Sequence, residues 1–239
     1  MTGQTFTGVL EFEAKGKAWK VSHESPACAN VIPQIDGLLV VPTDLGGGLR
    51  GGDSWTQSVK VCNGAQVTWK PPSCTLVHAD VAGRPTKLEQ SVFVGKGCRL
   101  DYLSKAFVPC AGAFLEQNLR IELESGCDAL ILDWWTLGRL ASGESGQFLQ
   151  VKNLSEVYFD KRLIWKESWD MKGGDVQKGL AVLAGNGMWM NILSCGDASH
   201  SRAQALTRRL EAQGGWASSG ELTAGLRLTR LFSSEWIDF

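Results

Sequence analysis

The chain has 239 residues, with 24 Lys and Arg against 25 Asp and Glu, and a formal net charge of -1. This balance argues against nucleic acid as a partner, because binding to phosphates needs clustered basic side chains, and here they are scattered. No apolar run reaches the ~18 residues that a membrane-spanning helix requires, and the first ten residues lack a signal-peptide pattern, so we expect a cytoplasmic protein without a membrane partner.

Short apolar runs are broken about every ten residues by Gly, Asn, Asp or Pro, which is typical of an all-β chain with many turns. Residues 1–239 suffice for one large all-β domain and are few for two. In chain order, we expect strands over residues 8–14, 37–43, 55–62, 66–70, 74–82, 87–94, 99–104, 114–124, 128–137, 147–152, 155–159, 162–169, 180–184, 187–194 and 221–232.

Side-chain alternation is clearest in LRIELE, residues 119–124, where Leu119, Ile121 and Leu123 share one face of the expected strand. In KLEQSVFV, residues 87–94, a similar apolar face is interrupted by Gln90. Near the C-terminus, residues 199–213 instead show helical spacing and end at two glycines, so one or two helices are expected there.

A weak internal repeat places a glycine and a small residue after a strand. It recurs in VKVCNGA (59–65), VFVGKGC (92–98) and IELESGC (121–127), and VLAGNGM (182–188) is a degraded candidate for a fourth copy. Repeats of about 30 residues indicate stacked β-coils that share a core. Ordinary hairpins with similar turns are the alternative, and the sequence does not decide between them.

The glycine-rich segment LGGGLRGGDSW covers residues 45–55. A phosphate-binding loop is excluded, because no Lys-Ser/Thr pair or helix pattern follows and Asp53 would repel a phosphate. The segment is then either a plain turn or a turn that presents the Asp53 carboxylate to an interior channel.

Two other groups of side chains could carry chemistry. Asp133 and Glu144 could form the carboxylate pair of a hydrolase, or they could neutralise Arg139 between them. His78, Cys74 and Cys62 could bind a metal, although seven Cys without a secretion signal are more readily explained as reduced thiols. The three His are far apart and no CxxC occurs, so a closed zinc site has no support.

Five segments follow one another along the chain: GGLRGGD (47–53), GAQVTWKPPSCTLVH (64–78), LDYLSKAFVP (100–109), LDWWTLGRLASGE (132–144) and SEVYFDKRLIWKE (155–167). In this order they resemble the UreD family of urease accessory proteins, also called UreH, and the resemblance covers residues 37–232. It implies a non-enzymatic, β-helix-like scaffold that binds UreF directly and the GTPase UreG through UreF.

The resemblance further implies that this assembly docks on apo-urease and that Ni²⁺ passes in transit through a tunnel in this subunit, with no tightly bound cofactor. By motif match, the acids along the tunnel would be Asp53, Asp133 and Glu167, followed by Asp101 and Glu144. The structural loop residues would be Gly47, Gly48, Gly51, Gly52, Gly138 and Arg139.

Two rival functions are kept alongside this one: a free-standing metal-binding chaperone, and a carboxylate-dependent hydrolase. The conduit hypothesis predicts that replacing both Asp53 and Asp133 by Ala reduces urease activation and leaves the complex with UreF intact.

Overall fold

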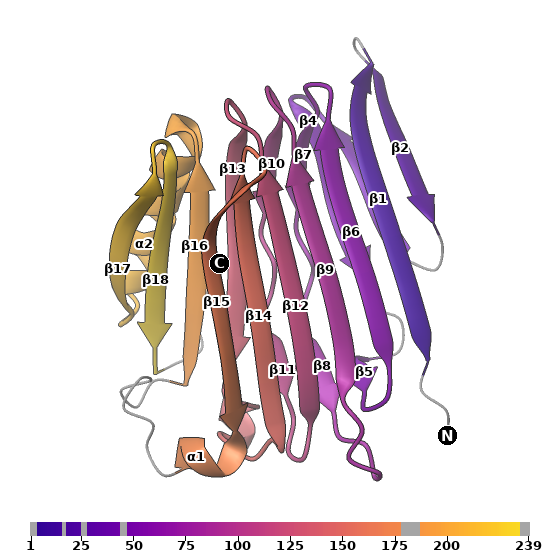
Figure 1. Cartoon of the computed structure of the whole chain (residues 1–239), viewed down its shortest axis with the longest axis vertical. Helices are drawn as coiled ribbons and strands as arrows, with labels where there is room; N and C mark the ends of the chain where they lie inside the picture. The colour runs from indigo at the N-terminus through magenta and orange to yellow at the C-terminus, as the bar shows by residue number, and fades with distance from the viewer. Residues whose placement is uncertain (1–3, 16–17, 25–27, 44–46, 178–186, 235–239) are drawn as a thin grey trace.

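The computed structural model describes residues 4–15, 18–24, 28–43, 47–177 and 187–234. Within these ranges the chain forms two β-sheets that face each other, with few helices (Figure 1). The first sheet has the strand order β15-β14-β12-β9-β6-β1-β2. Its strands are β1 (Thr5–Lys15), β2 (Ala18–Glu24), β6 (Ser54–Cys62), β9 (Thr86–Val94), β12 (Phe114–Leu123), β14 (Gln150–Phe159) and β15 (Arg162–Lys172).

The second sheet has the main order β17-β18-β16-β13-β10-β7-β4-β3, and three short strands, β5, β8 and β11, continue it. Its strands are β3 (Cys28–Gln34), β4 (Gly37–Thr43), β5 (Leu49–Arg50), β7 (Gln66–Trp69), β8 (Thr75–His78), β10 (Arg99–Tyr102), β11 (Phe107–Pro109), β13 (Asp128–Thr136), β16 (Met188–Cys195), β17 (Trp216–Thr223) and β18 (Leu226–Ser233).

The internal repeat builds stacked coils, and the hairpin alternative is wrong. At Gly64, Gly97 and Gly126 the chain turns with φ of 77°, 72° and 82°, a conformation that favours glycine, and it crosses from the first sheet to the second. Strands β6, β9 and β12 pair in parallel in one sheet, and β7, β10 and β13 do so in the other. The residue after each glycine, Ala65, Cys98 or Cys127, is buried. Residues 182–186 of the fourth candidate copy lie outside the described residues.

The coils end where the chain reverses. A turn at Asp160 and Lys161 returns β15 antiparallel to β14, so residues 147–159 contain one long strand where two were predicted. Strands β16, β18 and β17 then extend the second sheet antiparallel, and the predicted strand 221–232 is the β17–β18 hairpin. The predicted strand 180–184 lies outside the described residues, and the strands β2, β3, β5 and β11 were not predicted.

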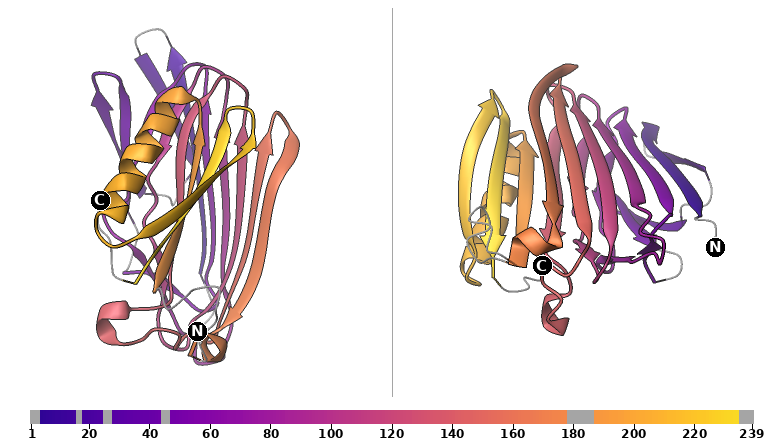
Figure 2. Two further views of the ribbon diagram at one scale, coloured as in Figure 1. Left: turned by 90° about the vertical axis from the view of Figure 1, so that its left-hand side faces the viewer. Right: turned by 60° about the horizontal axis from the view of Figure 1, so that its bottom comes forward.

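Helices lie at the C-terminal side of the coils. The predicted helix over 199–213 is confirmed as α2 (Asp197–Glu211), which lies against the outer face of the second sheet (Figure 2). A short helix, α1 (Gly173–Gln177), follows β15, and a 3-10 turn (Leu140–Ser142) follows β13. In the part of the chain that the structure describes, no helix is long and apolar enough to cross a membrane.

Candidate functional site

The space between the two sheets contains two apolar clusters that are separated by a row of polar side chains. One cluster includes Val59, Val92 and Ile131, and the other includes Leu88, Leu115 and Trp135. We call the row between them the polar belt. It consists of Gln57, Gln90, Gln117, Asn153, Ser155 and Glu167 from the first sheet and Tyr102, Asp133, Asn191 and Arg230 from the second.

The belt follows from strand geometry. Successive side chains of a strand point to opposite faces, so the residues two before and two after an inward-facing residue also face inward. The inward-facing neighbours of Gln57 on its strand are Trp55 and Val59, and those of Asp133 are Ile131 and Trp135. Polar positions pair directly at Gln57–Gln90, at Gln117–Asn153 and at Asp133–Asn191. Between β9 and β12 the row steps by one inward-facing position, because Gln117 pairs with Leu88, and it steps likewise between β10 and β13, because Tyr102 pairs with Ile131.

At the β6 end the belt is closed by hydrogen bonds. Gln90 Nε2 donates to Gln57 Oε1 over 3.0 Å, and the Tyr102 hydroxyl donates to the same oxygen over 3.2 Å. All three side chains are buried. Burial raises the pKa of Tyr102 and the charge of Asp133 adds to this effect, so the Tyr102 hydroxyl stays protonated and remains a donor.

Asp133 is the buried carboxylate of the belt, and its side chain is 8% exposed. Burial raises the pKa of Asp133 to about 6; the charge of Glu167 adds to the rise, and Trp135, Asn191 and Gln117 oppose it. Its Oδ2 atom, like both amide atoms of Gln117, has no hydrogen bond of ordinary geometry with the described residues. Asp133 therefore has an oxygen available to a further ligand and is mainly ionised at neutral pH.

Glu167 lies at the other end of the belt, on the edge strand β15. Arg230 on β18 donates from Nη2 to Glu167 Oε1 over 2.5 Å and from Nε to Asn191 Oδ1 over 3.0 Å. Asn191 Nδ2 in turn donates to Glu167 Oε2 over 3.3 Å. We call these three residues the Glu167–Asn191–Arg230 triad, and it joins the edge strand β15 of the first sheet to β16 and β18 of the second.

Two cavities adjoin this triad. The inner one has a volume of about 10 Å³, room for about one water molecule, and is lined by Asp133, Ser155 and Asn191 together with apolar side chains. The outer one has a volume of about 180 Å³ and is lined by Glu167, Arg230 and, among others, Trp169 and Trp189. The belt thus has a polar inner end at Asp133 and an outer opening at the triad.

Asp53 is not a member of the belt. Its Oδ2 atom accepts the backbone amide of Arg50 over 2.8 Å, and its Oδ1 atom accepts that of Gln4 over 2.9 Å, so the carboxylate closes the turn before β6 and holds the start of the chain. The glycines serve the same turn. A Cβ on Gly48 would collide with the backbone oxygen of Leu76, and its φ of 122° favours glycine. Gly47, Gly51 and Gly52 lie in the same loop.

Replacing Asp53 by Ala is therefore expected to lower the free energy of unfolding by about 1–2 kcal/mol, because two amides lose an acceptor. Urea unfolding of the folded protein measures this loss. Asp53→Asn keeps one carbonyl acceptor and serves as the matched variant, with an expected loss of about half that size. An Asp53→Ala protein of unchanged stability that activated urease poorly would instead place Asp53 on the metal path.

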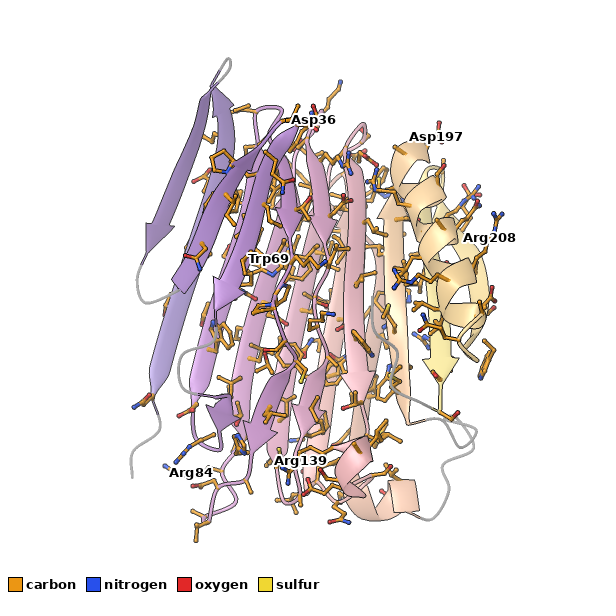
Figure 3. The ribbon with its side chains drawn as sticks, turned by 180° about the vertical axis from the view of Figure 1, so that it is seen from behind. Asp36, Trp69, Arg84, Arg139, Asp197 and Arg208 are labelled. Atoms are coloured by element: carbon orange, nitrogen blue, oxygen red, sulfur yellow. The ribbon has the colours of Figure 1, made fainter. Side chains whose placement is uncertain are left out.

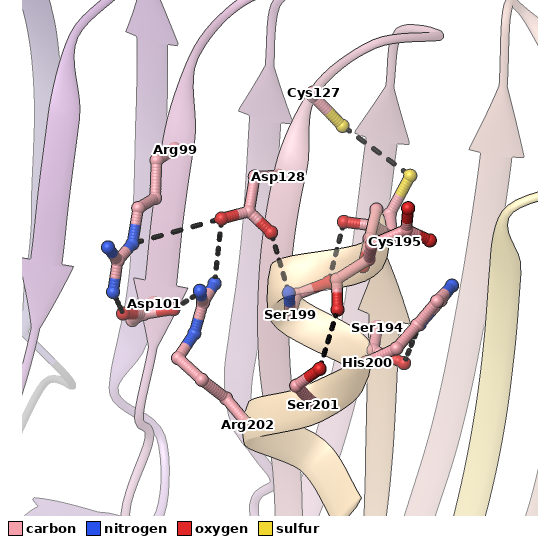
Figure 4. Close-up of polar contacts among 12 residues, drawn as sticks. Arg99, Asp101, Cys127, Asp128, Ser194, Cys195, Ser199, His200, Ser201 and Arg202 are labelled. Atoms are coloured by element: carbon pink, nitrogen blue, oxygen red, sulfur yellow. Dashed lines mark hydrogen bonds and ion pairs between the residues drawn. The ribbon is translucent and has the colours of Figure 1, made fainter.

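Asp101 also lies away from the belt. In β10 it alternates with Leu100 and Tyr102, which face the interior, so its side chain points to the outer face beneath α2. There it pairs with Arg99 Nη2 at 2.7 Å and Arg202 Nη2 at 2.9 Å (Figure 4). Arg202 also pairs with Asp128, which accepts the Ser199 amide. This network fastens α2 to the coils.

Glu144 lies in the loop that follows β13. It forms a bidentate ion pair with Arg139 and accepts the Ala111 amide, and the guanidinium of Arg139 lowers the pKa of Glu144. A Cβ on Gly138 would collide with the backbone oxygen of Glu144, which explains the glycine. Arg139 lies at the same end of the molecule as Arg84, whose side chain lies beside Gly52 of the glycine-rich turn (Figure 3). Of the five predicted acids, the structure brings only Asp133 and Glu167 to the belt.

The rival sites do not form. No group of three or more His, Cys, Asp or Glu side chains lies close enough to hold a metal ion among the residues that the structure describes. His78 instead contacts the carbonyl oxygen of Gly47 at 3.2 Å, and the pKa of Cys62 is raised by burial. Glu144 pairs with Arg139 in a loop, whereas Asp133 faces the interior between the sheets. Neither of the two cavities described above is lined by both carboxylates, so these residues do not form the carboxylate pair of a hydrolase.

Several belt residues were not predicted from the sequence, among them Gln57, Gln117, Asn191 and Arg230. A signal was present, because each is a single polar residue with apolar neighbours two positions away on both sides. Gln90 showed this interruption in the sequence, but one interruption does not reveal a row. The row becomes visible only when the register of the strands is known.

The chain is similar in sequence to known urease accessory proteins. A family model described as UreD urease accessory protein matches residues 17–235, which includes the motif range 37–232. The chain is 24% identical to the urease accessory protein UreD of Chelativorans sp. (strain BNC1) over 187 residues, 77% of this chain and 67% of that protein. It is 28% identical to the protein of the same name from Deinococcus radiodurans over 193 residues, 79% of this chain and 66% of that one.

A third relative, urease accessory protein UreD 1 of Streptomyces griseus, is 28% identical over 166 residues, 70% of this chain and 63% of that protein. The chain thus spans about two thirds of the length of these curated relatives.

Proposed function

Because this chain belongs to the UreD family of urease accessory proteins, we propose that it is a cytoplasmic, non-enzymatic scaffold that conducts Ni²⁺ to the active site of urease. In this role it binds UreF directly and UreG through UreF, and the assembly docks on apo-urease. Nickel is the cargo of the scaffold and not a resident cofactor.

The polar belt is the observation that supports this role. An all-β interior is normally filled with apolar side chains, because a buried polar group costs free energy unless it is paired. Here a continuous row of polar groups divides the core, and two of them, Asp133 and Glu167, are carboxylates. Such a costly arrangement requires a function, and a path for a cation provides one.

The donor atoms of the belt suit transit better than storage. Its oxygen donors are carboxylates, amides and hydroxyls, and it contains no Cys or His, the ligands that hold nickel and zinc firmly. Spaced oxygen ligands bind a dication weakly enough to release it to the next position, as in cation-selective pores. The Arg230 guanidinium and the carboxylates of Asp133 and Glu167 give the belt one positive and up to two negative charges.

Reconstitution tests the proposal. Purified apo-urease, UreF, UreG, GTP and Ni²⁺ are combined with and without this chain, and urea hydrolysis and bound nickel are measured. We expect nickel-dependent activity to rise at least tenfold when the chain is present, with a complex that contains UreF and this chain on gel filtration. Equal activation with and without the chain, at matched nickel, would refute the proposed role.

A further inference from the structure

The Glu167–Asn191–Arg230 triad occupies the point where the belt meets the outside. The outer cavity of about 180 Å³ is lined by Glu167 and Arg230, and the inner cavity of about 10 Å³ is lined by Asp133 and Asn191. The triad therefore contributes lining residues to both cavities, Glu167 and Arg230 to the outer one and Asn191 to the inner one. We propose that the Glu167–Arg230 ion pair is a cation-displaceable gate that keeps monovalent ions out of the belt. This inference rests on the proposed function, since it assigns regulation to the same path.

The contacts of Arg230 show why it can act as a gate. Its guanidinium binds Glu167 and Asn191 at once, and both partners face the interior. The side chain of Arg230 is 34% exposed and that of Glu167 is 19% exposed, so the pair is reached from the outer cavity and is not sealed in the core. The two residues are 63 positions apart in sequence and join the edge strand β15 of the first sheet to β18, the second strand from the edge of the other sheet.

Charge decides which ions can open the gate. At the same distance from a carboxylate, a dication gains twice the Coulomb energy of a monovalent ion. A guanidinium that is hydrogen-bonded to Glu167 and Asn191 is a strong competitor for a monovalent ion, because Arg matches a carboxylate geometrically and is weakly hydrated. A dication can displace it from Glu167 and would then meet the Asp133 carboxylate next, beside the inner cavity. Arg230 is thus a specificity-determining residue.

Equilibrium dialysis of the full chain against Ni²⁺ tests the gate. We expect Arg230→Gln to bind Ni²⁺ at least tenfold more tightly than the wild-type chain, because Glu167 loses its competing cation. Arg227→Gln is the matched control, since Arg227 lies on the same strand, three residues earlier, and is exposed on the opposite face. It removes the same charge from the chain and should leave the affinity unchanged. Adding Glu167→Gln to Arg230→Gln should return the affinity to that of the wild type.

Several results would overturn the gate: an unchanged affinity of Arg230→Gln, an equal gain in Arg227→Gln, or a gain that survives Glu167→Gln. If Arg230→Gln does not fold, Arg230→Lys is used. That variant keeps the charge but loses the Nε hydrogen bond to Asn191, so we expect a gain of about threefold, and no gain refutes the gate.

Dialysis and urease loading separate the two proposals. If Arg230→Gln binds nickel more tightly but urease loading does not depend on this chain, the gate stands and the conduit falls. If the belt variants impair loading while Arg230→Gln leaves the affinity unchanged, the conduit stands and the gate falls.

Discussion

Replacing Asp133 by Asn is expected to slow the nickel loading of urease at least tenfold while the folded scaffold becomes more stable. The Asn side chain has the same shape but carries no charge. At an effective dielectric constant of about 20, two unit charges ~4 Å apart interact by about 4 kcal/mol, and a dication doubles this value. Each 1.4 kcal/mol of interaction energy changes an equilibrium constant tenfold. Losing even a small part of the attraction between Asp133 and the dication would therefore slow transit measurably.

The gain in stability follows from the raised pKa of Asp133. A folded-state pKa of about 6, above the ordinary value of 3.8, means that the folded protein binds more protons than the unfolded chain between these pH values. The stability contributed by this group is therefore present below about pH 4 and is lost as the pH rises through about 6. Asp133→Asn removes this loss, so the free energy of unfolding at pH 7.5 should rise by up to about 3 kcal/mol.

The same titration predicts the pH dependence of loading. As the pH falls below about 6, Asp133 becomes protonated and the belt loses a negative charge, so wild-type loading should decline. The Asp133→Asn protein should show no such decline. Asp170→Asn is the control, because Asp170 is an exposed acid on the outer face of β15. An Asp133→Asn protein that loads urease at the wild-type rate would remove Asp133 from the path.

The repeated turns of the coils could be predicted from the sequence because their cause is local, whereas the choice of stacked coils over hairpins rested on the resemblance to the UreD family. The glycine at each turn must adopt a positive φ, and the small residue after it must fit a crowded corner, so three copies leave a visible repeat. The strands β2 and β3 were missed, and β17 was not separated from β18. Their pairing is antiparallel at the ends of the sheets and has no such repeat.

The site could be predicted only in part, because its contacts join distant segments. Family motifs pointed to Asp133 and Glu167, and the structure places both in the belt. Asp53 occurs in an equally good motif and Asp101 in a weaker one, but Asp53 closes a turn and Asp101 lies on the outer face. These positions depend on the path of the backbone and not on residue type. Arg230 interrupts an apolar face between Leu228 and Phe232, but nothing in the sequence indicates its partner Glu167, which is 63 residues away.

Replacing Gln117 by Leu tests most directly whether the belt is the path of nickel. Gln117 is 2% exposed, and its inward-facing neighbours on β12 are Leu115 and Leu119. A leucine there would continue the apolar face and join the two clusters across the belt. It also removes a buried amide that has no hydrogen bond of ordinary geometry with the residues that the structure describes, so the fold should be kept or stabilised.

Asn118→Leu is the matched control, because it places the same side chain on the outer face of the same strand. The measurement is the nickel content of urease after loading by complexes that contain wild-type, Gln117→Leu or Asn118→Leu protein and equal amounts of UreF. We predict at least a tenfold slower gain of nickel with Gln117→Leu and the wild-type rate with Asn118→Leu. Wild-type loading by an intact Gln117→Leu complex would contradict the assignment of the belt as the nickel path.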